Sequence, residues 1–110
     1  MHPNMSSYTA SKHAVISMTK CVALECAGFG VRVNAICPGP INTNMIQAFE
    51  TTMKIAHLDP LQKQQFLETH LPMGRYGLPE EVAEVVAFLA SDNASYVTGG
   101  IYTVCGAVSL

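Results

Sequence analysis

Two short runs of β-branched and apolar residues constrain what this 110-residue chain can fold into. The first run is Val31–Cys37, closed by the turn Pro38-Gly39-Pro40, and the second is Tyr96–Val104. The residues between them carry helical patterns, and strands joined by so long a helical crossover pair in parallel. A parallel pair is buried on both faces and needs further strands at its edges. We therefore expect one end of a larger α/β sheet whose N-terminal half is absent.

Three helices are expected around these strands. The first starts at a serine cap, Ser6 or Ser7, and runs until Gly28 and Gly30 stop it. A short one follows the Asp59-Pro60 cap as far as about Thr69, inside a weakly patterned insertion at 44–73. The last begins at Pro79, and its apolar positions recur at helical spacing: Val82, Val85, Val86 and Leu89. The whole chain, 1–110, is interpreted as part of a single domain.

Composition excludes several classes of function. Hydrophobic residues make up 49% of the chain and the formal net charge is −2, with no run of Lys or Arg, so neither a nucleic acid nor an anionic membrane surface is an expected partner. No apolar stretch approaches the roughly 20 residues of a membrane span, and the N-terminus lacks a signal-peptide core, so a cytoplasmic protein is expected. The four cysteines fall at no metal-ligand spacing, and no metal site is predicted.

Tyr8 and Lys12 are candidates for acid/base chemistry. They are four residues apart on the first predicted helix, so their side chains share one face. An ammonium about 4 Å from a phenol contributes on the order of 4 kcal/mol at an effective dielectric of 20, equivalent to roughly three pKa units. Such a phenol can exchange a proton with an alcohol oxygen at neutral pH. The alternative is a chance pair on a helix surface, and the spacing alone does not decide between them.

Several segments around this pair occur in a characteristic order. They are Ser7–Ala14, then Val31–Met45, then Gly74–Ala83 with Phe88–Asp92, and finally Tyr96–Gly100 with Val104–Gly106. In this order and spacing the chain resembles the short-chain dehydrogenase/reductase family along essentially its whole length. The resemblance implies the C-terminal portion of a Rossmann-like, doubly wound parallel sheet, and an NAD(P)-dependent oxidoreductase that moves hydride between the nicotinamide and a secondary alcohol or ketone.

The resemblance also implies a set of site residues. Tyr8 corresponds to the family's acid/base, and Lys12 to its partner, which also binds the nicotinamide ribose. Pro38 and Gly39 resemble the turn beside the cofactor at the carboxyl end of a strand. The Ile41 backbone and the Thr43 hydroxyl resemble contacts to the carboxamide and phosphate end. Without the resemblance, Pro38-Gly39 is equally an ordinary tight turn and Thr43 a helix cap.

The insertion at 44–73 corresponds to the family's substrate lid. Its apolar side chains either bind a lipid-like, steroid-like or carrier-bound acyl substrate or simply pack the lid against the body; they are Met45, Ile46, Phe49, Met53, Ile55, Leu58, Phe66 and Leu67. His57 and His70 also lie in this segment and are interpreted as incidental.

Other family features have no counterpart in these residues. Gly28-Phe29-Gly30 follows a helix and precedes a strand, the reverse of the order in a phosphate-binding loop. The residue that selects NAD or NADP and the catalytic serine are also missing, so cofactor preference is open and the isolated chain is expected to be inactive. Cys105 stands where many relatives carry Asp, a change expected to affect packing or subunit contacts.

These residues are compatible with two functions. In the first, the parent protein is the oxidoreductase, expected to act on a small alcohol or ketone and to form a homo-oligomer by resemblance. In the second, the chain is a non-catalytic interaction protein that associates with full-length relatives through its first helix or last strand, where apolar surface and an open sheet edge favour pairing. The first predicts a longer chain, and the second predicts association without activity.

Overall fold

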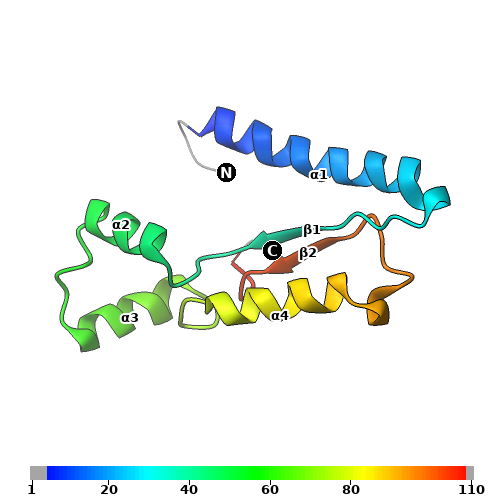
Figure 1. Ribbon diagram of the computed structural model, residues 1–110. Helices are drawn as coiled ribbons and strands as arrows, with labels where there is room; N and C mark the ends of the chain where they lie inside the picture. The colour runs from blue at the N-terminus through cyan, green and yellow to red at the C-terminus, as the bar shows by residue number, and fades with distance from the viewer. Residues whose placement is uncertain (1–4, 109–110) are drawn as a thin grey trace. The chain divides into compact units, whose positions relative to one another are not determined.

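A computed structural model describes residues 5–108 of the chain, with four α-helices and two strands in this range (Figure 1). Two short 3-10 turns complete it, η1 (Ala27–Phe29) and η2 (Asp92–Ala94). The two strands form one parallel sheet, which confirms the predicted α/β class. In chain order the elements are α1 (Ser6–Cys26), β1 (Ala35–Pro38), α2 (Asn44–Thr52), α3 (Pro60–His70), α4 (Pro79–Ala90) and β2 (Ile101–Val104).

Both strands are shorter than the sequence predicts. The predicted first strand begins at Val31, but β1 begins at Ala35, and the predicted second strand begins at Tyr96, but β2 begins at Ile101. Side chains interrupt the ladder before these points, because the Val33 amide donates to Thr98 Oγ1 at 3.0 Å. Asn34 Nδ2 likewise donates to the Val97 carbonyl at 2.9 Å. Side-chain hydrogen bonds therefore replace strand pairing over part of both apolar runs.

Helix α1 starts without a serine cap, contrary to expectation. Its N-cap position is Met5, and no side chain caps the helix. Ser6 and Ser7 lie inside the first turn, where the Met5 carbonyl accepts the Thr9 amide at 2.8 Å. The predicted end is confirmed: after η1, Gly30 takes the left-handed conformation with φ 73° and its amide returns to the Ala27 carbonyl.

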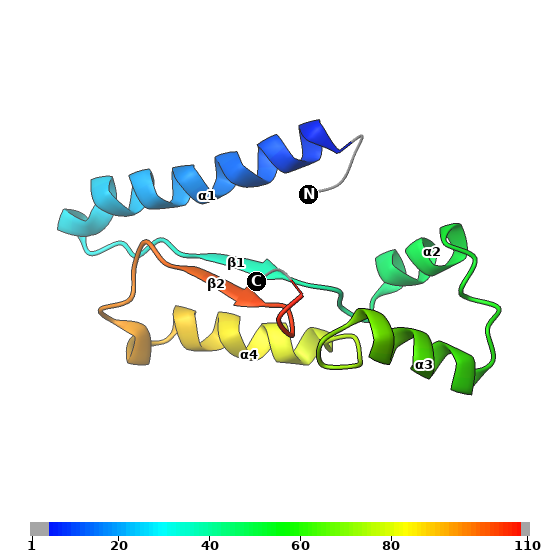
Figure 2. The same cartoon turned by 180° about the vertical axis from the view of Figure 1, so that it is seen from behind.

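The insertion holds two helices where one was predicted, so the expected number of about three helices is one too low. Helix α3 begins as expected, with a capping box in which the Gln62 amide donates to Asp59 Oδ1 at 2.8 Å. Helix α2 has no such capping box: Thr43 stands at its N-cap, but the Thr43 side chain makes no capping hydrogen bond. Figures 1 and 2 show α2 and α3 as neighbouring helices in the insertion at 44–73.

The described residues divide into two compact units. The first runs to Ile36 and includes Phe88–Tyr102; the second comprises Cys37–Ala87 and the residues from Thr103 onward. Each has a small core, formed by Ala23, Leu89 and Ala94 in the first and by Ile55 and Leu67 in the second.

Large apolar side chains remain exposed in both units, among them Leu24 at 82% and Met45 at 82%. Exposed apolar surfaces of this kind mark contacts with further protein or with a ligand. Within residues 5–108, no helix combines the length and the apolar character needed to cross a membrane.

Candidate active site

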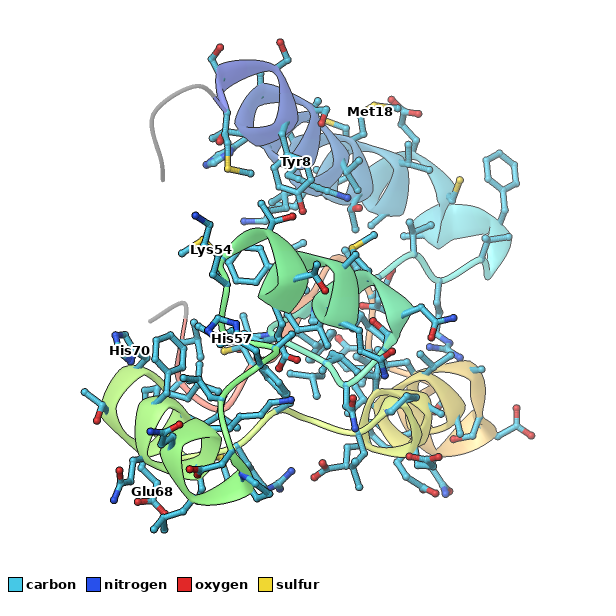
Figure 3. The ribbon with its side chains drawn as sticks, turned by 90° about the vertical axis from the view of Figure 1, so that its left-hand side faces the viewer. Tyr8, Met18, Lys54, His57, Glu68 and His70 are labelled. Atoms are coloured by element: carbon cyan, nitrogen blue, oxygen red, sulfur yellow. The ribbon has the colours of Figure 1, made fainter. Side chains whose placement is uncertain are left out.

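The predicted acid/base pair lies near the start of α1, in the first unit. Tyr8 and Lys12 are one turn apart, and Lys12 Nζ lies over the Tyr8 ring at 5.2 Å from its centroid. This is within the range of a cation–π contact. Tyr8 is 56% exposed, and Figure 3 shows its side chain projecting from α1. The structure therefore places the Lys12 ammonium over the ring of an accessible tyrosine, on the shared helix face that the i, i+4 spacing predicts.

Pro38 and Gly39 end β1 beside the C-terminal strand. The Gly39 amide donates to the Val104 carbonyl at 2.9 Å. A Cβ added at Gly39 would lie 2.7 Å from Cys105 Cα and 2.8 Å from Cys105 Cβ. Only glycine allows the two backbones to approach this closely. The turn is thus built on a specific contact with Cys105.

Ile41 lies in a second parallel pairing, an isolated bridge to Gly77. The Gly77 amide donates to the Pro40 carbonyl at 2.9 Å, and the Asn42 amide donates to the Gly77 carbonyl at 2.8 Å. Neither of these bonds uses the amide or carbonyl of Ile41 itself. The neighbours of Ile41 hold the segment in place, and the peptide groups of Ile41 are not consumed by the bridge.

Thr43 occupies the N-cap position of α2 with extended backbone, φ −137° and ψ 173°. Its carbonyl accepts the Gln47 amide at 3.1 Å, but its hydroxyl does not cap the helix. The alternative interpretation of Thr43 as a helix cap is therefore right for the backbone and wrong for the side chain. Pro38, Gly39, Ile41 and Thr43 all belong to the second unit, and Tyr8 and Lys12 to the first.

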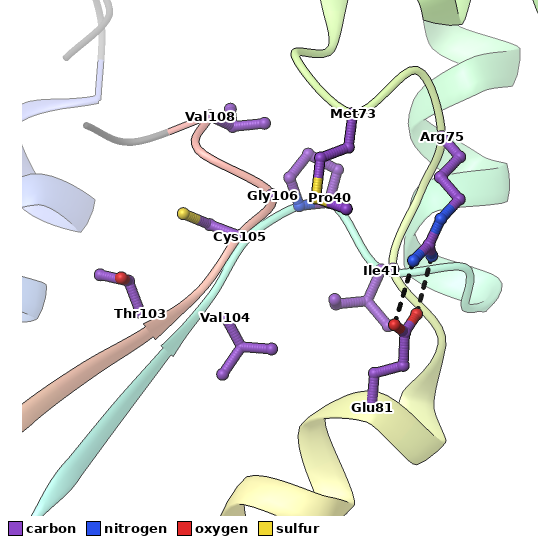
Figure 4. Close-up of a pocket in the computed structure, with 11 residues that line it drawn as sticks. Pro40, Ile41, Met73, Arg75, Glu81, Thr103, Val104, Cys105, Gly106 and Val108 are labelled. Carbon is purple, nitrogen blue, oxygen red and sulfur yellow. Dashed lines mark hydrogen bonds and ion pairs between the residues drawn. The ribbon is translucent and has the colours of Figure 1, made fainter.

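An ion pair that no sequence motif indicates borders a pocket of about 230 Å³ in the second unit (Figure 4). Arg75 binds the Glu81 carboxylate through both terminal nitrogens, at 2.8 and 3.1 Å, and the Leu78 amide donates to Glu81 at 3.0 Å. These hydrogen bonds lower the pKa of Glu81 to about 2 and raise the pKa of Arg75. The other lining residues are Pro40, Ile41, Met73, Gly77, Thr103, Val104, Cys105, Gly106 and Val108.

A buried carboxylate in the insertion at 44–73 was also not predicted. Glu50 is only 3% exposed, and its oxygens accept from Lys63 Nζ at 2.9 Å and from the Tyr76 hydroxyl at 2.7 Å. The pKa of Tyr76 is raised to about 12 by burial, by its hydrogen bond to Glu50 and by the negative charge of Glu50. Burial alone would raise the pKa of Glu50, but the two hydrogen bonds and the Lys63 charge lower it. The three residues lie on three separate segments of the chain, so no local motif indicates them.

His70, in the insertion at 44–73, makes contacts within its own helix. The His70 ring stacks on Phe66 with centroids 4.1 Å apart, and its Nδ1 lies 2.8 Å from the Phe66 carbonyl oxygen. Figure 3 labels His57 and His70, which both lie in the insertion at 44–73. In the part of the chain that the structure describes, no three His, Cys, Asp or Glu side chains form a group that could hold a metal ion.

Comparison with known proteins identifies the family. A family model described as enoyl-(acyl carrier protein) reductase matches residues 1–109. The chain is 47% identical over 104 residues to cyclohexanol dehydrogenase of an Acinetobacter species, covering 94% of this chain and 36% of the relative. It is 43% identical over 105 residues to 3-oxoacyl-[acyl-carrier-protein] reductase of Thermotoga maritima, covering 96% of this chain and 39% of the relative.

A solved structure agrees with these relatives. The crystal structure of an actinorhodin polyketide ketoreductase with NADPH superimposes with a TM-score of 0.84 at 36% identity, over 97% of this chain and 41% of that one. The chain belongs to the short-chain dehydrogenase/reductase family. It spans about two fifths of the length of these relatives.

Proposed function

We propose that the protein to which these residues contribute is an NAD(P)-dependent oxidoreductase that interconverts a secondary alcohol and a ketone. The observation that carries the proposal is the Tyr8–Lys12 pair, in which the Lys12 ammonium lies 5.2 Å from the centroid of the accessible Tyr8 ring. Family membership supports the reaction class, because the relatives described above are dehydrogenases and reductases by name.

The proposed roles follow from the chemistry of the two side chains. The Tyr8 hydroxyl donates a proton to the ketone oxygen in reduction and accepts one from the alcohol in oxidation. The Lys12 ammonium stabilises the negative charge that develops on the phenol oxygen when that proton leaves. When bound, a nicotinamide dinucleotide supplies or accepts the hydride. Both protein groups are on one rigid helix, which fixes their mutual geometry.

Four residues of the second unit are proposed to contact the cofactor. The Ile41 peptide groups, which its bridge to Gly77 leaves unused, suit hydrogen bonds to a carboxamide. The Thr43 hydroxyl, which does not cap α2, suits a phosphate oxygen. Pro38 and Gly39 hold this segment at the end of β1. Either NAD or NADP fits these contacts, because none of them reaches the group that distinguishes the two cofactors.

A second candidate is association without catalysis, in which α1 pairs with a related subunit. It is favoured by exposed apolar side chains on α1, namely Val15 at 55%, Met18 at 62% and Leu24 at 82%. Sedimentation of the 110-residue chain alone and with a full-length relative distinguishes the two candidates. Stable mixed assembly without turnover favours association; turnover that depends on Tyr8 favours the enzyme.

The direct test is a chimera in which residues 1–110 replace the matching segment of the Acinetobacter cyclohexanol dehydrogenase. We expect reduction of NAD⁺ or NADP⁺ with a secondary alcohol. Replacing Tyr8 with Phe should lower the rate by about 10²-fold or more, the usual contribution of a general acid/base. The matched control is Tyr96→Phe, because Tyr96 is 100% exposed and should leave the rate unchanged. An active Tyr8→Phe chimera would contradict the proposed role.

A further inference from the structure

Glu50 is a buried carboxylate on a helix, α2, that is otherwise mostly exposed. Glu50 lies on α2 and is 3% exposed, although most of its helical neighbours face solvent. A charged group out of contact with water is costly unless it is paired and hydrogen-bonded. Glu50 has both kinds of partner, in the Lys63 ammonium at 2.9 Å and the Tyr76 hydroxyl at 2.7 Å. The buried placement of the Glu50 carboxylate therefore depends on these two contacts.

The two partners come from two other segments of the second unit. Lys63 lies on α3, and Tyr76 lies in the connection that precedes α4. Each carboxylate oxygen receives a different donor, because Lys63 binds Oε2 and Tyr76 binds Oε1. Charge-assisted hydrogen bonds are short and directional. Rotation of α2 about its own axis would break both, so the pair of contacts fixes which face α2 presents.

One exposed stripe along α2 and its C-cap, Met53, is apolar. Met45, Phe49 and Met53 follow one another at steps of four residues, with exposed fractions of 82%, 53% and 55%. At 3.6 residues per turn, this stripe is centred roughly 100° around the helix from Glu50. Methionine and aromatic side chains form adaptable apolar binding surfaces. The lid set that the sequence left ambiguous thus divides into buried residues, such as Ile55 and Leu67, and an exposed stripe.

We infer that Glu50 is a positioning residue, which locks the roll of α2 through Lys63 and Tyr76 and so presents Met45, Phe49 and Met53 to the apolar part of a substrate. The inference deepens the proposed function and rests on it for the identity of the ligand. It predicts a substrate with a hydrophobic body adjoining its alcohol or ketone. The pKa of Glu50 is lowered and the pKa of Tyr76 is raised. Both directions agree with the inference, because they keep Glu50 ionised as the acceptor and Tyr76 protonated as the donor.

The test uses the 110-residue chain and two conservative variants, Tyr76→Phe and Glu50→Gln. Tyr76→Phe removes only the hydroxyl, and Glu68→Gln is the matched control, because Glu68 is an exposed lid carboxylate bonded to Gln64 at 2.9 Å. In Tyr76→Phe, carboxyl NMR should show the pKa of Glu50 rising from its lowered value, because burial remains while one donor is lost. Both variants should speed amide exchange in α2 about tenfold, and exchange in α4 should not change.

Peroxide oxidation followed by mass spectrometry measures how accessible the methionines of the apolar stripe on α2 are. Both variants should change the rates at Met45 and Met53 relative to Met18, which lies on α1 and serves as the internal reference. An unchanged Glu50 titration, or unchanged methionine rates with unchanged α2 exchange, would overturn the inference. A uniform loss of amide protection across the whole chain would also overturn the inference. That result would show that Glu50 stabilises the chain as a whole and does not position α2 in particular. None of these measurements requires turnover. They can therefore contradict the role of Glu50 while the proposed oxidoreductase activity holds, and they can support that role if the activity is absent.

Discussion

Replacing Gly39 with Ala should destabilise the second unit, because no space exists for a methyl group. The added Cβ would lie 2.7 Å from Cys105 Cα, 2.8 Å from Cys105 Cβ and 3.1 Å from the Cys105 carbonyl oxygen. Carbon atoms normally approach to about 3.5–4.0 Å, so the two backbones must separate by about 1 Å. That movement strains the Gly39 to Val104 hydrogen bond, now 2.9 Å.

The expected cost combines overpacking of about 1–3 kcal/mol with a weakened hydrogen bond of about 0.5–1.5 kcal/mol, so we expect a loss of about 1.5–4.5 kcal/mol. Urea unfolding followed by circular dichroism measures the change, with amide exchange of β2 as a local readout. The matched control is Gly28→Ala, since an added Cβ at Gly28 meets nothing within 4 Å. We expect no destabilisation there. If Gly39→Ala unfolds within about 0.5 kcal/mol of the unmodified chain, the close approach described here is wrong.

Three further outcomes are expected. Ala107→Gly should stabilise the chain by about 1 kcal/mol, because Ala107 has φ 71°, where a Cβ is unfavourable; a lower urea midpoint would contradict this. The pKa of Glu81 is about 2 in the folded chain against an ordinary 4.5, so Glu81 contributes stability above pH 4.5 that is lost as the pH falls toward 2. Glu81→Gln should flatten that dependence in low salt, and an unchanged pH profile would refute the role of the Arg75 pair. Thr43→Val should leave the thermal midpoint unchanged, because the hydroxyl caps nothing, while it weakens nucleotide binding in the chimera; a lower midpoint would show a structural role.

The elements with local chemical signals were predictable from the sequence. The Asp59-Pro60 cap marked the start of α3, and the apolar spacing after Pro79 marked α4. The turn at Gly30 marked the end of the first helix with its 3-10 extension. Capping and glycine turns act within a few residues, which is why sequence patterns locate them.

The remaining features depend on contacts between distant segments. Helix α2 was missed because the sequence at 44–73 is only weakly patterned, although Thr43 at its N-cap is a residue type that favours helix starts. The strands were predicted too long because Thr98 and Asn34 compete with the ladder. The Glu50 network joins three segments that no short motif connects. In the candidate site, the i, i+4 rule alone placed Lys12 beside Tyr8. The assignments of Ile41 and Thr43 came from the family resemblance and stay predictions.

The proposed oxidoreductase activity depends above all on Tyr8 as the proton donor and acceptor. Single-turnover kinetics of the chimera, followed by nucleotide fluorescence, tests this role most directly because they separate cofactor binding from hydride transfer. For Tyr8→Phe we predict nucleotide affinity close to that of the unmodified chimera and a transfer rate lower by about 10²-fold or more. An unchanged transfer rate, or a loss confined to nucleotide affinity, would contradict the role of Tyr8.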